Sequence, residues 1–133
     1  MKNERFIRTK VVSLVDEDEN KTFNECSFIS SEIKSSMLKN HTFDNCHFLM
    51  SDFIGCDLTK SKFIDCYFEN LDFRLCDLVM CEFTNCKFVN SEFTLCDLDE
   101  SEFFHCKAKN LSWEKCSMID MDMDENHFST IDV

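Results

Sequence analysis

The stretch that decides the fold is "NLDFRLCDLVMCEFTNCKF", residues 70–88, in which an apolar residue recurs at every fifth position. These residues are Phe73, Leu78, Phe83 and Phe88, and a cysteine precedes three of them by two places. In an α-helix, positions five apart differ by roughly 140° around the axis, so these side chains would not share a face. In a flat strand, an odd spacing would send successive side chains to opposite faces. The spacing therefore predicts a solenoid, in which the chain turns every few residues and returns to the same interior.

The same five-residue spacing extends from Phe23 to Val133. All 23 positions in this series are apolar, although only 44% of the chain is hydrophobic. The position two residues before each central residue is mostly Cys or Ser, so each unit places one large and one small side chain inside. Two residues after the central residue stand seven of the ten Asn, together with Gly55, Asp65 and Asp120. These residue types tolerate positive φ, which predicts a corner at the end of each unit.

Units such as "CDL", "CEF", "CKF", "SEF" and "CYF" closely resemble those of the pentapeptide-repeat family. The resemblance implies an all-β fold, a right-handed quadrilateral parallel β-helix with four units in each coil. Residues 21–133 would then form about five to six coils, a rod about 27 Å long if the coils are separated by the usual strand spacing. At 133 residues the chain is expected to be a single domain.

Residues 1–20, "MKNERFIRTKVVSLVDEDEN", do not keep the spacing and are expected to cap the first coil of the β-helix at 21–133. The apolar run at Val11, Val12, Leu14 and Val15 favours a strand or a short helix there, with a free arm as the alternative. This run is too short for a signal peptide, and no transmembrane segment is expected.

The other end has no evident polar cap, so apolar side chains are expected to lie exposed there. The resemblance implies a homodimer formed through the C-terminal coils, and a monomer whose last coil frays is the alternative. The candidate interface residues are Trp113, Met121, Phe128, Ile131 and Val133.

The ten cysteines occupy the small inward position that Ser fills elsewhere, so we expect them to be buried and reduced. That expectation favours a cytoplasmic protein. Cys76, Cys81 and Cys86 lie five residues apart but include no CxxC pair and no clustered His, so no metal site and no cofactor are predicted. Cysteines 20 residues apart, such as Cys46 and Cys66, would stack closely enough to permit adventitious oxidation.

The sequence does not indicate an enzyme, because its His, Asp and Glu residues fall mainly at outward positions of a rod with a filled interior. A net charge of −12 without a basic run argues against direct nucleic-acid binding. The acidic residues are spaced by 20, which predicts columns along the rod. The candidate partner-binding columns are Asp52, Asp72 and Glu92 on one face, Asp57, Asp77 and Asp97 on the next, and Glu82 and Glu102 on the third. A fourth face carries His47, Tyr67, Lys87, Lys107 and His127 instead.

Two functions are open for this surface. The first is a non-catalytic protein-interaction module whose specific partner is unknown, with exposed apolar residues such as Leu75, Leu95 and Phe104 contributing to contact. The second follows from the resemblance to the quinolone-resistance members of the family. It is an acidic DNA mimic that binds DNA gyrase or another topoisomerase and protects it against quinolones.

Overall fold

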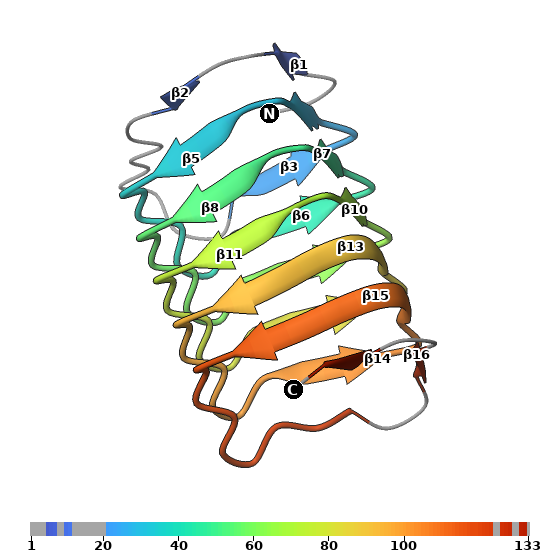
Figure 1. The fold of residues 1–133 in the computed structure, drawn as a ribbon. Helices are drawn as coiled ribbons and strands as arrows, with labels where there is room; N and C mark the ends of the chain where they lie inside the picture. The colour runs from blue at the N-terminus through green and yellow to red at the C-terminus, as the bar shows by residue number, and fades with distance from the viewer. Residues whose placement is uncertain (1–4, 8–9, 12–20, 124–125, 129–130, 133) are drawn as a thin grey trace.

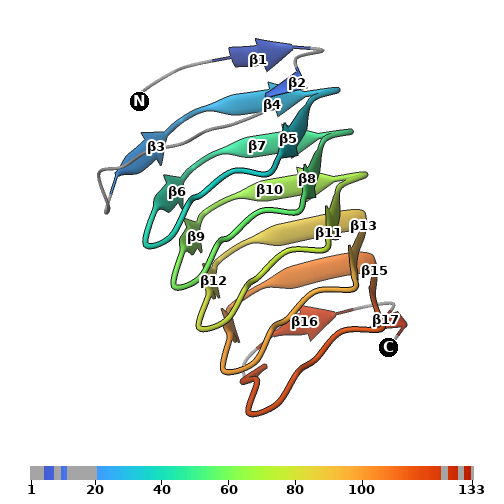
Figure 2. The same cartoon turned by 90° about the vertical axis from the view of Figure 1, so that its left-hand side faces the viewer.

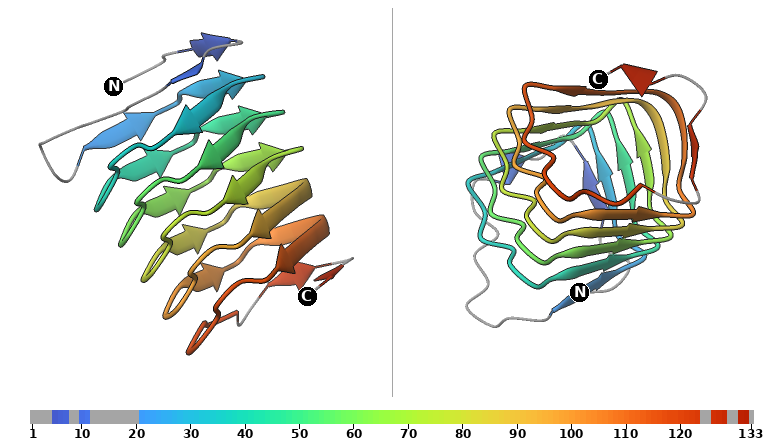
Figure 3. Two further views of the ribbon diagram at one scale, coloured as in Figure 1. Left: turned by 60° about the vertical axis from the view of Figure 1, so that its left-hand side comes forward. Right: turned by 90° about the horizontal axis from the view of Figure 1, so that it is seen from below.

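The computed structural model describes residues 5–7, 10–11, 21–123, 126–128 and 131–132. These residues form 17 short strands and no helix, wound into a rod of stacked coils (Figures 1 and 2). Seen along its axis, the rod has a four-sided outline (Figure 3). The predicted fold class, a parallel β-helix of the pentapeptide-repeat type, is confirmed.

Three of the four faces are built from parallel strands. Face 1 contains β2 (Lys10–Val11), β5 (Glu32–Lys34), β8 (Asp52–Ile54), β11 (Asp72–Arg74) and β17 (Ile131–Asp132). Face 3 contains β3 (Thr22–Asn24), β6 (Thr42–Asp44), β9 (Lys62–Ile64), β12 (Glu82–Thr84) and β14 (Glu102–Phe104). Face 4 contains β1 (Arg5–Ile7), β4 (Ser27–Ile29), β7 (His47–Leu49), β10 (Tyr67–Glu69) and β16 (His127–Phe128). The longer strands β13 (Lys87–Thr94) and β15 (Lys107–Glu114) run along face 4, through the corner and into face 1.

Face 2 differs from the others because it is held by isolated bridges instead of strands. These bridges join Met37, Asp57, Asp77, Asp97 and Ser117 in successive coils. At the following corner the chain closes a tight turn, as in the bond from the Ser61 amide to the Leu58 carbonyl at 3.0 Å. The "CDL" units of the sequence lie on this face, so Leu marks the turn face and Phe marks the stranded faces.

Partners on neighbouring coils are 20 residues apart from residue 22 onward, as the five-residue unit requires. The aromatic rings therefore stack in columns: Phe48, Phe68 and Phe88 have centroids 5.1 and 4.7 Å apart with planes within 10°. Rings on the opposite faces 1 and 3 meet edge to face inside the rod, as Phe73 and Phe83 do at 6.1 Å and 85°. Both geometries are favourable for aromatic pairs, so the same packing is repeated in every coil.

Every corner residue from Glu25 to Asp120 lies in the left-handed region, with φ between 48° and 64°. Nine of these 20 positions carry Asn, Asp or Gly, as predicted, and the other eleven carry residues such as Leu75 and Met80. The coil geometry therefore imposes positive φ even where the side chain disfavours it.

The described part of residues 1–20 adds strands to the first coil. Strand β1 pairs with β4 and β2 pairs with β5, and the partners are 22 residues apart: Phe6 with Phe28 and Val11 with Ile33. The partners are thus two residues farther apart in sequence than in the later coils, which explains why residues 1–20 do not keep the five-residue spacing. Val12, Leu14 and Val15 lie outside the described residues, and the division at residue 20 stays a prediction.

At the C-terminal end, Phe128 and Ile131 continue the 20-residue register beside Ala108 and Leu111. Trp113 is only 3% exposed and stacks on Phe93 with centroids 6.0 Å apart. The expectation that this ring lies open at the end of the rod is therefore wrong, because it is part of the chain's own core. Met121 is half-buried, and Val133 lies outside the described residues.

Candidate functional site

The acidic columns predicted from the 20-residue spacing run along three faces of the rod. Asp52, Asp72 and Glu92 are direct partners on face 1. Asp57, Asp77 and Asp97 are bridge partners on face 2. On face 3, Glu82 lies between Lys62 and Glu102. The structure therefore brings all eight candidate carboxylates into columns, and their role in binding a partner stays a prediction.

The carboxylates of face 2 also have a structural role that sequence analysis missed. In each case the Asp Oδ1 accepts the backbone N–H two residues later: Thr59 bonds Asp57 at 3.1 Å, Val79 bonds Asp77 at 3.1 Å and Asp99 bonds Asp97 at 3.0 Å. These amides lie at the entry to the tight turn. The signal for this role is the "D-L-x" sequence, since Asp and Asn favour such side-chain to backbone bonds at turns.

The last bridge on face 2 replaces Asp with Ser117, and the carboxylate function moves to a neighbour. Asp99 Oδ1 accepts the Ile119 amide at 2.8 Å and the Ser117 hydroxyl at 2.5 Å. The Ser117 hydroxyl bond, followed by the Ile119 amide bond, lowers the pKa of Asp99 below its ordinary value. The Ile119 turn amide therefore bonds a carboxylate of the preceding coil, because its own coil has Ser117 at the position that Asp holds elsewhere.

On face 1, Asp52 and Asp72 are half-buried and Glu92 is exposed. Asp52 Oδ1 accepts the Asp72 amide at 3.0 Å, and Asp72 Oδ1 accepts the Thr94 hydroxyl at 3.2 Å. Burial, followed by repulsion from Glu92, raises the pKa of Asp72 to about 6. Burial also raises the pKa of Asp52. Face 1 therefore carries a charge that changes with pH just below neutrality.

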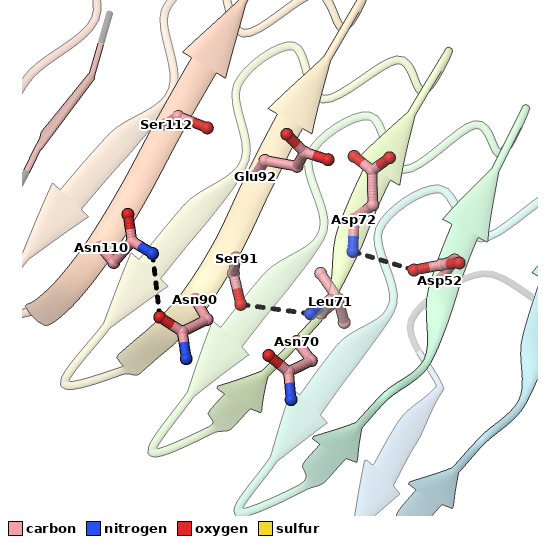
Figure 4. A pocket seen from close by; sticks show the side chains of 9 residues that line it. All are labelled: Asp52, Asn70, Leu71, Asp72, Asn90, Ser91, Glu92, Asn110 and Ser112. Atoms are coloured by element: carbon pink, nitrogen blue, oxygen red, sulfur yellow. Dashed lines mark hydrogen bonds between the residues drawn. The ribbon is translucent and has the colours of Figure 1, made fainter.

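An open depression of about 550 Å³ lies along face 1 and its corner with face 4 (Figure 4). Its lining is mainly polar and includes a bond from Asn110 Nδ2 to Asn90 Oδ1 at 2.9 Å, and a bond from the Leu71 amide to Ser91 Oγ at 3.3 Å. The remaining lining residues are Asp52, Asn70, Asp72, Glu92 and Ser112. The depression is therefore an open, polar surface that includes three carboxylates.

Lysines lie on face 3, beside its carboxylates, and on face 4, which has no predicted acidic column. On face 3, Lys62 Nζ lies 3.8 Å from Glu82, with both side chains about half exposed. On face 4, Lys87 Nζ lies 6.0 Å from the centre of the Tyr67 ring, and Lys107 follows in register. The surface is therefore acidic on three sides and basic on one.

Exposed apolar residues interrupt the charged surface at the corners and on face 3. The three residues predicted to be exposed are so: Leu75 by 54%, Leu95 by 41% and Phe104 by 47%. Sequence analysis missed Met37, Met50 and Ile119, which are exposed by 57%, 59% and 65%. Met50 occupies a corner position with a φ of 50°, and this left-handed geometry turns its side chain outward.

The cysteines form two inward columns along the rod, and all ten are free thiols. Nine are buried and Cys116 is half-buried. From Cys46 onward, each thiol in the columns donates to the carbonyl 23 residues before it, as Cys66 does to Phe43 and Cys76 to Phe53, at 3.2 and 3.3 Å. A third position holds Cys81, whose thiol pKa is raised by burial. Buried thiols of this kind are poor nucleophiles.

In the part of the chain that the structure describes, no three His, Cys, Asp or Glu side chains come together as metal ligands. Within the same residues, no helix is long and apolar enough to cross a membrane. The candidate site is therefore the outer surface of the rod, with the acidic columns and exposed apolar residues described above.

These features define a class of protein: a four-sided β-solenoid with a filled aromatic core and charged columns on its surface. The family described as pentapeptide repeats matches the sequence with eight copies, over residues 43–78 and 51–88. This confirms the resemblance to the family over residues 43–88.

Two solved structures support the same assignment of the fold. Rfr23, a pentapeptide repeat protein from the cyanobacterium Cyanothece 51142, superposes with a TM-score of 0.67 at 8% identity and covers 92% of each chain. A trypsin-treated form of QnrB1, a plasmid-mediated fluoroquinolone resistance protein, superposes with a TM-score of 0.54 at 15% identity, over 98% of this chain and 76% of the other. At these identities the likeness is one of fold alone. No curated protein matches the chain in sequence.

Proposed function

We propose that this protein is a non-catalytic interaction module that binds a protein partner through the surface of its β-helix, in the cytoplasm. One observation carries the proposal: ordered columns of carboxylates and exposed apolar side chains share the surface of a rod whose interior is filled. The fixed strand spacing holds these groups in a rigid array, so little ordering entropy is lost when a partner binds. The partner's contact surface is expected to be basic, with apolar side chains at its centre.

A pull-down with purified full-length protein tests this proposal. The variant D57N/D77N/D97N removes charge from face 2, and L75S/L95S/F104S removes the exposed apolar contacts. We expect each variant to weaken retention of a partner held by the wild-type chain, whereas K87Q/K107Q, on the basic face, leaves it unchanged. Equal retention by all four proteins would contradict the proposal.

The Asp to Asn changes are suited to this test because an amide oxygen can replace Asp Oδ1 as the acceptor for the turn amides. Folding is therefore expected to survive while three charges are lost. Circular dichroism spectra and thermal unfolding of each variant provide the control for folding.

The alternative function is an acidic DNA mimic that binds DNA gyrase or another topoisomerase and protects it against quinolones. It is favoured by the density of carboxylates along the rod. The coil with Asp72, Asp77 and Glu82, like the coil that follows it, carries one acid on each of three faces. At a strand spacing of about 4.8 Å, this gives one carboxylate per about 1.6 Å of axis. Double-stranded DNA carries one charge per about 1.7 Å.

Inhibition of gyrase supercoiling separates the two functions. A DNA mimic is expected to inhibit at micromolar concentration, the D57N/D77N/D97N variant to lose most of that inhibition, and K87Q/K107Q to keep it. Absence of inhibition by folded wild-type protein would remove the mimic and leave the general interaction module.

The homodimer through the C-terminal coils is also part of this proposal, with Met121, Phe128, Ile131 and Val133 as candidate contacts. Trp113, the fifth residue predicted for this interface, is buried within its own chain and is therefore not among these contacts. Sedimentation equilibrium would show a mass twice that of the 15.7 kDa chain if the dimer forms. A single-chain mass throughout the micromolar range would exclude it.

A further inference from the structure

The last described coil has an interior that differs chemically from the rest of the rod. Its four successive inward positions are Cys116, Met118, Met121 and Met123, which we call the terminal sulfur cluster. From residue 21 to 115, no inward position carries Met. The three methionines of that region lie outward and are exposed: Met37, Met50 and Met80. Inward methionine is therefore confined, among the described residues, to this end.

The backbone fixes these four positions around one corner of the coil. On face 2, the bridge between Asp97 and Ser117 places Cys116 and Met118 one coil below Cys96 and Leu98. On face 3, the bridge between Glu102 and Asp122 places Met121 and Met123 below Ser101 and Phe103. In the coil above, these two faces are joined by the tight turn that bonds the Ser101 amide to the Leu98 carbonyl at 3.1 Å.

All four side chains of the terminal sulfur cluster pack against the same apolar core and are partly buried. They are therefore directed to a common interior and remain within reach of solvent. In the part of the chain described by the structure, no bridge continues from Ser117 or Asp122 to a further coil. Among the described residues, the cluster therefore lies in the last bridged coil of faces 2 and 3, and its side chains are less enclosed than the buried thiols of the preceding coils.

A fifth sulfur lies next to the cluster. The Cys116 thiol donates to the Phe93 carbonyl at 3.3 Å, and the Cys96 thiol donates to the Phe73 carbonyl at 3.0 Å. The two thiols thus occupy equivalent places in adjacent coils, about 4.8 Å apart along the axis.

We propose that the terminal sulfur cluster binds a soft monovalent metal ion, Cu(I) in the cell, through the three thioethers and the Cys116 thiolate. Thiolate and thioether sulfur select soft ions of this kind, whereas Mg²⁺ and Ca²⁺ prefer oxygen ligands. Binding involves no change of oxidation state: the ion gains sulfur ligands, and the proton of the Cys116 thiol passes to solvent.

The surroundings favour entry of a cation. Asp120 and Asp122 are exposed and belong to the same segment as the cluster, and the chain carries a net charge of −12. Such a field raises the local concentration of cations near the cluster. Simple packing would explain each methionine singly, because Met fills irregular gaps. It does not require sulfur at four successive inward positions.

Nuclear magnetic resonance of the full chain with ¹³C-labelled methionine methyl groups tests the proposal, with Ag(I) as a redox-inert probe. Reduced protein is titrated with silver nitrate in a chloride-free buffer without oxygen. We expect the methyl signals of the three cluster methionines to shift until one equivalent has been added. The signals of the three outward methionines should not move. No shift in the cluster, or equal shifts in both groups, would overturn the proposal.

Matched variants separate metal binding from packing. M118L/M121L/M123L keeps the size and apolar character of the side chains but removes the thioethers, and C116S removes the thiol. We expect each to weaken Ag(I) binding at least tenfold in competition with free methionine. The control M37L/M50L/M80L should bind as the wild type does. Unchanged affinity in the first variant would overturn the proposal. The methyl shifts of the wild-type chain provide a test even if a variant folds poorly.

Discussion

Replacing Asp72 with Asn should change the way in which stability depends on pH. The carboxyl of Asp72 has a folded-state pKa of about 6, above the ordinary value of 3.8. The folded protein therefore binds this proton more tightly than the unfolded chain does. For a raised carboxyl, the free energy of unfolding falls as pH rises from about 4 to about 6, and the loss is complete above that range.

The magnitude follows from the shift and the exposure of the carboxyl. A difference of about 2 pKa units corresponds to about 3 kcal/mol if fully expressed. Asp72 is only partly buried, and solvent and salt screen its repulsion from Glu92, so we expect about 1 kcal/mol. The Asn side chain keeps an acceptor for the Thr94 hydroxyl and cannot ionise, so D72N should be more stable than the wild type at pH 7 by about this amount.

Urea unfolding followed by circular dichroism and Trp113 fluorescence, at pH values from 4 to 7, measures this difference. The variant E92Q serves as the matched case, because it removes the neighbouring charge and leaves the burial of Asp72. It should reduce the pH dependence only in part. If D72N and the wild type have the same dependence on pH, then burial and repulsion on face 1 do not perturb Asp72, and the reasoning is refuted.

Four further substitutions test the coil geometry by equilibrium unfolding. Gly55→Ala should destabilise by about 1 kcal/mol, because an added Cβ meets nothing within 4 Å but must adopt a φ of 64°. Leu75→Gly, one coil along the same corner, should be neutral or stabilising, and a loss as large as that of Gly55→Ala would contradict corner strain. Phe68→Ala should cost about 3–5 kcal/mol because the ring is fully buried between two stacked rings, and a cost below 1 kcal/mol would be inconsistent with this packing. Cys81→Ser should change stability by less than about 1 kcal/mol, since Ser61 makes the equivalent bond one coil earlier; a greater loss would show that sulfur is required there.

The sequence predicted the interior of the rod well because one side-chain position in five is fixed by the geometry of the coil. Every central residue from Phe23 to Trp113 is buried, including Ala108 at 5% exposure. The same reasoning failed at the N-terminal end, where a shift of two residues moves Phe6 and Val11 into central positions. A count in fives cannot follow the chain across such a shift, because only pairing with the next coil reveals it.

The candidate site was predicted less completely than the core. Spacing by 20 located each column, but not the bonds that individual carboxylates make. Asp77 bonds its own turn, whereas Asp52 bonds the amide of Asp72 in the next coil. These differences depend on local burial and on whether a face holds strands or turns, which the repeat does not encode. Trp113 was misplaced for a related reason: the spacing treats every coil alike and does not show that this ring packs on Phe93 and Phe103 inside the rod.

The buried thiols of the two columns can serve as chemical probes in successive coils of the rod. Cys26, Cys46, Cys66, Cys86 and Cys106 lie in five consecutive coils, and a thiol reagent can reach each one only when its own coil opens. Alkylation rates measured for each cysteine would therefore give the opening free energy of each coil, without the need to introduce new cysteines. Such a profile would show whether this solenoid unravels from one end or opens as a single cooperative unit.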